Sequence, residues 1–95
     1  QTTKVRGMFV HPGQVAEVVK RFPEIAKARL VVTGEMANDQ MSLHVETTAL
    51  TDETLKAKVA EAVRDVTKLR SDVQLVAIGS LVNDGKVIED ARSYQ

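Results

Sequence analysis

The chain has 95 residues, and its 13 Lys and Arg balance its 13 Asp and Glu, so the formal net charge at pH 7 is zero. This length fits one domain, which buries roughly 60–65% of its unfolded surface and leaves no room for a deep, closed active site. The balanced charge and an aromatic content of 3% argue against a nucleic-acid binder. The absence of cysteine excludes disulfides, thiolate zinc ligands and thiol nucleophiles. The longest apolar run is too short to span a bilayer.

The N-terminal segment predicts a strand followed by a helix. Residues 4–10 are rich in Val, Met and Phe and predict one strand, in which Gly7 marks a bulge or the close approach of another backbone. Pro12 suits the first turn of a helix, and Pro23 ends it. Between them, apolar residues at i, i+3, i+4 and i+7 predict a buried helix face, formed by Val15, Val18, Val19 and Phe22.

The middle of the chain predicts a hairpin. Segments 28–32 and 41–45 alternate apolar and other residues with the period of a strand, and the turn region 34–39 separates them. Two such strands with a short connection favour an antiparallel pair.

A longer helix follows, with Thr51 as its predicted N-cap. Its apolar positions are spaced by four and three residues: Leu55, Val59, Ala62, Val66 and Leu69. Residues 73–78 predict the last main strand, 79–86 a loop, and 87–95 a polar tail with a short helix. The order β-α-β-β-α-β predicts an α+β fold of ferredoxin-like type, a two-layer sandwich with two helices on one face of an antiparallel sheet.

Few residues point to chemistry. The only histidines, His11 and His44, lack the spacing of a metal site, and Ser80 lacks the Gly-x-Ser-x-Gly frame of a hydrolase. Two places remain: the basic pair before Gly7, and the loop Asn83–Val87, in which Gly85 precedes Lys86. A loop lysine is usually only solvated. The functional alternative is a mobile lysine that brings a positive charge to a phosphate or carboxylate.

The segment Lys4–Pro12 (KVRGMFVHP) resembles the opening of the C-terminal domain of phenylacetate–CoA ligases, which belong to the adenylate-forming superfamily. Segments 66–70 (VTKLR) and 83–90 (NDGKVIED) resemble the end of the same domain. The resemblance covers essentially the whole chain. It implies that residues 1–95 form one mobile C-terminal domain of a larger ligase, whose N-terminal ATP- and acid-binding domain is not in this sequence.

The resemblance also implies an activity in two steps. An aryl-acetic acid reacts with ATP and Mg²⁺ to give an acyl-adenylate, and the thiol of coenzyme A (CoA) then displaces AMP. The small domain closes over the N-terminal domain of the same polypeptide and rotates between the steps. The implied enzyme is cytoplasmic, acts on small molecules without nucleic-acid or membrane partners, and could form a homodimer. The 95 residues alone are expected to be inactive.

Four residues take roles from this resemblance. Lys86 matches the catalytic lysine of adenylation, where a cation stabilises the charge on the transferred group. Gly85 lets its loop come close to the substrate. Gly7 matches the glycine that leaves room for the pantetheine arm of CoA, with a simple strand bulge as the alternative. Lys4 matches a lysine that contacts the adenylate in some relatives.

The sequence departs from the family pattern in three places. Ile78 and Val82 stand where the family usually has proline, and Ser71 stands where it has glycine. The missing prolines predict a less constrained loop over residues 79–85. The hinge residue of the superfamily is expected upstream of Gln1.

Two other functions share the same topology. One is a stand-alone regulatory module of ACT type that binds a small ligand such as an amino acid, which rests on the order of elements alone. The other is an RNA-binding domain, against which the neutral charge and the few aromatics count.

Overall fold

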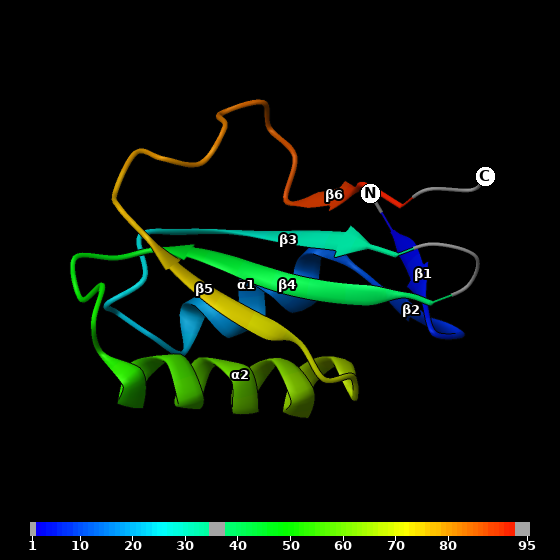
Figure 1. Ribbon diagram of the computed structural model, residues 1–95, viewed down its shortest axis with the longest axis horizontal. Coiled ribbons are helices and arrows are strands. Elements are labelled where there is room, and N and C mark those ends of the chain that lie inside the picture. Colours follow the sequence, from blue (N-terminus) through cyan, green and yellow to red (C-terminus); the bar gives the residue numbers. More distant parts are fainter. Residues whose placement is uncertain (1, 35–37, 93–95) are drawn as a thin grey trace.

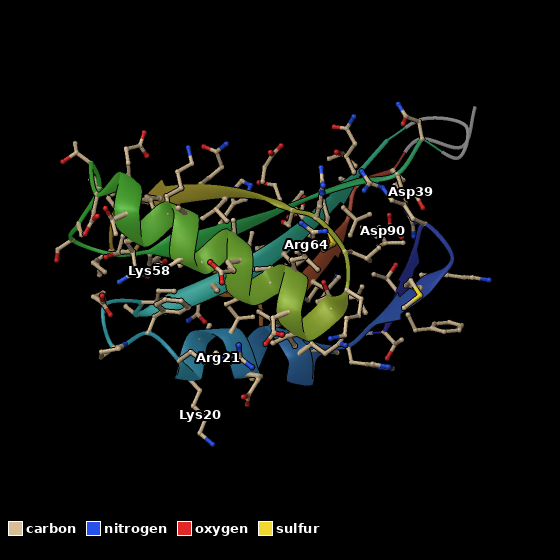
Figure 2. All side chains as sticks on the ribbon, turned by 90° about the horizontal axis from the view of Figure 1, so that it is seen from below. Lys20, Arg21, Asp39, Lys58, Arg64 and Asp90 are labelled. Carbon is tan, nitrogen blue, oxygen red and sulfur yellow. The ribbon has the colours of Figure 1, made fainter. Side chains whose placement is uncertain are left out.

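The computed structural model describes residues 2–34 and 38–92. Strands β3 to β6 form one sheet in the order β5-β4-β3-β6, and Figures 1 and 2 show both helices against one of its faces. The predicted two-layer α+β sandwich is confirmed. The elements are β1 (Thr3–Val5), β2 (Met8–Val10), α1 (Pro12–Lys20), β3 (Lys27–Thr33), β4 (Gln40–Glu46), α2 (Glu53–Thr67), β5 (Asp72–Val76) and β6 (Ile88–Asp90).

The sheet is mixed rather than antiparallel. The predicted hairpin of β3 and β4 is confirmed, with Lys27 opposite Glu46 and Thr33 opposite Gln40. In contrast, β5 runs parallel to β4, and β6 runs parallel to β3. The expectation of an antiparallel sheet was wrong because α2 carries the chain back along the sheet, so the strand after it starts at the same end as β4.

The first predicted strand is a separate two-stranded hairpin. Val5 pairs with Met8 across a two-residue loop of Arg6 and Gly7, whose φ angles are 49° and 82°. Positive φ at both positions is the pattern of a type I′ loop. Gly7 therefore lies in a hairpin turn, and the strand bulge is excluded. The hairpin was missed because Asn, Asp or Gly normally occupies the first loop position, which here holds Arg6.

Two further expectations needed correction. In its described part, residues 87–92, the polar tail contains a strand and not a helix, because Ile88–Asp90 pairs with Leu30–Val32 of β3. Helix α2 is capped by Asp52 and not by Thr51, since the Asp52 carboxylate accepts a hydrogen bond from the Leu55 N–H at 3.0 Å. Two predicted segments lie partly outside the described residues: the turn 34–39, at residues 35–37, and the tail, at residues 93–95.

The core lies between the helices and the sheet. Every second residue of β3 and β4 faces the helices, and the predicted apolar face of α2 packs against them. The core side chains include Val18, Leu30, Val32, Leu43, Val45, Val59 and Ile88. Neither helix in the described part of the chain is long and apolar enough to cross a membrane.

We expect Leu43→Ala to lower the free energy of unfolding by about 2–5 kcal/mol, because Leu43 is 1% exposed at the centre of the core. Urea unfolding followed by circular dichroism measures this change. Leu50→Ala is the matched control, since Leu50 is 47% exposed, and it should change the value by less than about 0.5 kcal/mol. Equal losses for both variants would contradict the placement of the core.

Candidate functional site

The loop that carries Lys86 crosses the sheet on the face opposite the helices. Strands β5 and β6 lie at opposite edges of the sheet, so residues 77–87 must pass over β4 and β3, as Figure 1 shows. Side chains of the sheet hold the loop: the Glu46 carboxylate accepts the Leu81 N–H at 2.9 Å, and Lys27 Nζ donates to the Val82 carbonyl at 3.1 Å. The crossing is therefore tethered although the family prolines are missing.

Glu46 is a buried carboxylate that the loop keeps ionised. Hydrogen bonds from the backbone of Gly79 and then of Leu81 hold the pKa of Glu46 below its usual range. The side chain is nearly enclosed, because the whole residue is only 5% exposed. An ionised carboxylate that accepts two backbone N–H groups is an anchor for the first half of the loop.

Arg29 is the main tether of the second half. Its side chain is 8% exposed and forms a two-pronged contact with the Asp84 carboxylate, at 2.8 and 3.2 Å. Its Nε donates to Glu89 at 3.0 Å, and its Nη1 also donates to the Lys86 carbonyl at 3.2 Å. The planar fork of arginine suits this geometry, and the carboxylates compensate the buried positive charge.

The backbone of Lys86 is held from both sides while its side chain is exposed. Asp84 accepts the Lys86 N–H at 3.0 Å, and Arg29 donates to the Lys86 carbonyl. Gly85 completes the turn with a φ of 76°. Within the described residues, the Lys86 ammonium makes no hydrogen bond or ion pair. The result is a lysine with a fixed base and a free cationic end.

We expect the Asp84 carboxyl to titrate at about 2, because the hydrogen bonds from Arg29 and from the Lys86 N–H lower its pKa from 3.8. Since the folded pKa is lowered, the stabilising contribution of Asp84 is present above the unfolded value and is lost as pH falls from about 4 towards 2. NMR titration of the carboxyl carbon measures this. In Arg29→Met the pKa should rise towards 3.8, whereas Arg21→Met, which removes an arginine from the other face, should leave it unchanged. An unchanged Asp84 pKa in Arg29→Met would contradict the tether.

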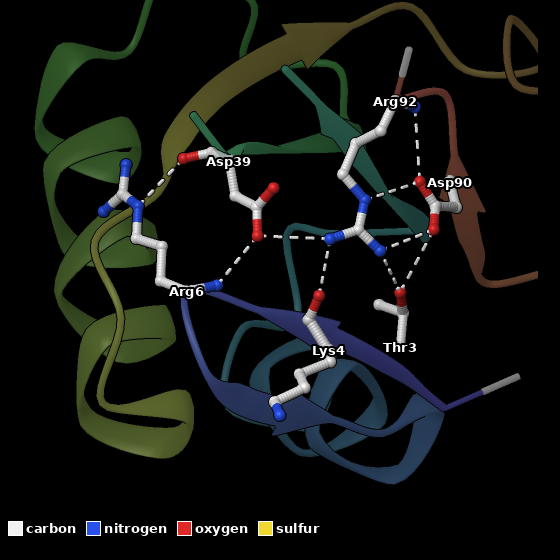
Figure 3. A network of polar contacts seen from close by, with 6 residues as sticks. All are labelled: Thr3, Lys4, Arg6, Asp39, Asp90 and Arg92. Atoms are coloured by element: carbon white, nitrogen blue, oxygen red, sulfur yellow. Dashed lines mark hydrogen bonds and ion pairs between the residues drawn. The ribbon is translucent and has the colours of Figure 1, made fainter. Parts of the chain in front are cut away.

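The second candidate segment is the β1–β2 hairpin, which a network around Arg92 attaches to the sheet (Figure 3). Arg92 is 12% exposed at its side chain and donates to the Lys4 carbonyl at 2.6 Å and to the Thr3 hydroxyl at 3.0 Å. The same guanidinium pairs with Asp90 at 2.6 Å and with Asp39 at 3.2 Å. It thus joins β1 to the end of β6 and to the start of β4.

The two carboxylates of this network stay ionised. Hydrogen bonds from Arg92 lower the pKa of Asp90 to about 2. The Arg6 N–H, at 2.9 Å, and then Arg92 hold the pKa of Asp39 below its usual range. The hairpin is therefore fixed by charged groups that do not titrate near neutral pH.

The predicted residues of the hairpin have clear local surroundings. Lys4 Nζ lies 5.7 Å from the centre of the Phe9 ring, within the range of a cation–π contact. A Cβ atom added at Gly7 would meet no atom within 4 Å, so within this chain the positive φ is what requires glycine there.

The four predicted site residues fall into two groups. Lys4 and Gly7 share the hairpin, and Gly85 and Lys86 share the crossing loop. Figure 1 shows the hairpin beyond the C-terminal end of β6, whereas Lys86 lies before its start. The two groups therefore lie at different places on the surface of the domain.

Sequence reasoning missed the two arginines that hold these groups. Arg29 alternates with apolar core residues, which indicates the outer face of a strand, but its partner Asp84 lies 55 residues away. Arg92 lies in the polar tail, and its contact with Lys4 spans 88 residues. Among the described residues, no group of three or more His, Asp or Glu could hold a metal ion.

Comparison with known proteins identifies the family. The model of the C-terminal domain of AMP-binding enzymes matches residues 7–91. The chain therefore belongs to this family. This match does not favour the alternative of a stand-alone regulatory module. The comparison with curated protein sequences found no significant match.

Solved structures share the fold. A domain of phenylacetate–coenzyme A ligase from Bacteroides vulgatus matches with a TM-score of 0.85 and 22% identity, over 98% of this chain and 94% of that one. A 2-hydroxyisobutyryl-CoA ligase, in complex with 2-HIB-AMP and CoA in the thioesterification state, matches with a TM-score of 0.84 and 24% identity, over 98% of this chain. The match spans only 22% of that ligase. The same ligase in the postadenylation state gives a TM-score of 0.76 and 23% identity, over 94% of this chain and 21% of that one.

Proposed function

We propose that this chain is the mobile C-terminal domain of an adenylate-forming acid–CoA ligase, which acts with an N-terminal domain of the same polypeptide that holds ATP and the acid. The observation that carries the proposal is the arrangement of Lys86. Its backbone is fixed at 3.0 and 3.2 Å by Asp84 and Arg29, and its ammonium extends from the domain without a partner in the described part of the chain. The family match over residues 7–91 supports it.

In the first step a carboxylate oxygen of the acid attacks the α-phosphorus of ATP, and the bond to pyrophosphate breaks. Two anions approach each other, so a cation placed beside the reacting phosphate lowers the barrier. Lys86 supplies this cation when the loop enters the active site. Magnesium, when bound with ATP, neutralises phosphate charge, and we assign no residue of this chain to it.

In the second step the CoA thiol attacks the acyl carbon, and AMP leaves. We assign the hairpin with Gly7 to this step, and Lys4 to a contact with the adenylate. Because Lys86 and Gly7 lie at different places on the domain, the domain must turn to present first one and then the other. The 2-hydroxyisobutyryl-CoA ligase has been solved in both a postadenylation and a thioesterification state, which fits such a rotation.

Exposed apolar side chains support contact with another domain at both segments. Met8 and Phe9, beside Gly7, are 44% and 60% exposed. Ile78 and Val82, in the crossing loop, are 54% and 62% exposed. These side chains are among the largest apolar groups that the domain exposes, and docking against the N-terminal domain would cover them in turn.

Phenylacetate or a related aryl-acetic acid is the proposed substrate. The support is the resemblance of the Lys4–Pro12 segment and the likeness to a domain of a phenylacetate–coenzyme A ligase. The residues that select the acid belong to the N-terminal domain. We propose a cytoplasmic enzyme, since its substrates ATP and CoA are intracellular.

In the full-length ligase we expect Lys86→Ala to lower adenylation by about 10²–10³-fold, because one charge-stabilising donor is lost from the transition state. Acid-dependent exchange of pyrophosphate into ATP measures this step. Thioester formation from supplied acyl-adenylate and CoA should change little. Lys58→Ala removes an exposed lysine from α2 and is the control for loss of charge. Equal loss of both half-reactions in Lys86→Ala would contradict the role of Lys86.

Gly7→Ala should show the reverse pattern, with a larger loss in thioester formation than in adenylation. In the 95-residue chain it should cost about 1–2 kcal/mol of stability, because alanine is strained at a φ of 82°. Gly13→Ala in the first turn of α1 is the control, since Gly13 has open space and no positive φ. A thioester rate that falls no more than adenylation would remove Gly7 from the second step.

A further inference from the structure

Asp84 and Gly85 form the only Asp–Gly pair in the chain, which has no Asn–Gly pair. In such a pair the backbone nitrogen of the glycine can attack the side-chain carboxyl carbon of the aspartate. Glycine favours this attack, because it has no Cβ to crowd the nitrogen. The pair directly precedes Lys86 in the crossing loop, so a change in its backbone would displace that residue.

The loop leaves the Gly85 nitrogen open to this reaction. Residues 83–87 form neither helix nor strand, and within the described part of the chain no hydrogen bond occupies the Gly85 N–H. Gly85 is exposed, and the Asp84 side chain is 34% exposed, so water can reach both residues. Neither regular structure nor burial therefore protects the pair.

The contacts of the Asp84 carboxylate do oppose the reaction. Arg29 donates to both carboxylate oxygens, at 2.8 and 3.2 Å, and the Lys86 N–H donates to Oδ1 at 3.0 Å. Ring closure needs the carboxyl plane to turn towards the Gly85 nitrogen, and these three hydrogen bonds resist that rotation. Ring closure also needs a neutral carboxyl group, because a carboxylate is a poor electrophile, and Arg29 keeps the group ionised by lowering its pKa.

We propose that Asp84 is a site of spontaneous backbone modification, at which isoaspartate forms, and that Arg29 restrains this reaction. The Gly85 nitrogen forms a bond to Cγ of Asp84 and loses its proton, while one carboxyl oxygen leaves as water. The product is a five-membered succinimide ring. Water then adds to the ring carbon that was the Asp84 backbone carbonyl and breaks its bond to the Gly85 nitrogen. Water is the only other reactant, released in the first step and consumed in the second.

The modification changes the segment that holds Lys86. The main chain of isoaspartate runs through Cβ and Cγ, so it is one atom longer, and its free carboxylate is attached to Cα. That carboxylate can no longer meet Arg29 and the Lys86 N–H in the geometry described above. The reaction does not depend on the proposed ligase function, so an absence of isoaspartate would leave the half-reaction experiments untouched, and the converse also holds.

The test is prolonged incubation of the 95-residue protein in neutral buffer. Peptide mapping with electron-transfer fragmentation then locates isoaspartate, which has the same mass as aspartate but gives different fragments. We expect isoaspartate at Asp84, and in Arg29→Met a rate about tenfold higher or more, since the neutral fraction of the carboxyl rises about tenfold for each unit of pKa. Arg29→Lys should give an intermediate rate, because the charge remains but the fork is lost.

Arg21→Met is the matched control, because it removes an arginine that pairs with Asp65 on the helices, and it should leave the rate unchanged. Circular dichroism shows whether each variant is folded. A peptide of residues 80–90 gives the rate without the Arg29 contact, and it should exceed that of the folded protein even if Arg29→Met does not fold. The proposal is overturned by equal rates in the folded protein and the peptide, by equal rates in the unaltered protein and a folded Arg29→Met, or by isoaspartate that forms mainly at another residue.

Discussion

The path of the chain between β5 and β6 is the constraint on which the rest of the structure depends. The two strands lie at opposite edges of the sheet, so eleven residues, 77–87, must cross its outer face. Backbone that crosses a sheet cannot join its ladder of hydrogen bonds and needs other partners. Charged side chains of the sheet provide them, chiefly Arg29. The outer face of the sheet is polar for this reason, and the crossing places Lys86 at its surface.

The two candidate segments are each attached to the sheet by a nearly enclosed arginine. Arg29 holds the loop of Lys86, and Arg92 holds the hairpin of Gly7; each guanidinium is almost enclosed and binds two carboxylates as well as a backbone carbonyl. A buried ion pair is weak evidence for stability, because the cost of desolvation offsets the attraction, so we assign these arginines to holding the geometry of the two segments. In the proposed two-step mechanism, segments held this firmly would be carried as rigid parts when the domain turns.

The hydrophobic pattern predicted the layers well, because it reports which faces are buried: α1, α2, β3 and β4 all follow it. The pattern failed for segments whose structure does not depend on the burial of apolar side chains. The loop of Arg6 and Gly7 lacks the usual residues of a hairpin turn, and β6 is three residues long and lies in a polar tail. Lys86 and Gly7 were predicted from a family resemblance. The roles of Arg29 and Arg92 depend on contacts across 55 and 88 residues, which no local sequence pattern contains.

The most direct test of the account is the backbone mobility of Lys86 in the 95-residue protein, measured by the heteronuclear ¹⁵N NOE with and without Arg29. The account predicts that the Lys86 amide in the unaltered protein is as rigid as β3, since Asp84 and Arg29 hold it. In Arg29→Met the Lys86 amide should become mobile while β3 and β4 stay rigid. A mobile Lys86 in the unaltered protein, or an equally rigid one in the variant, would contradict the account.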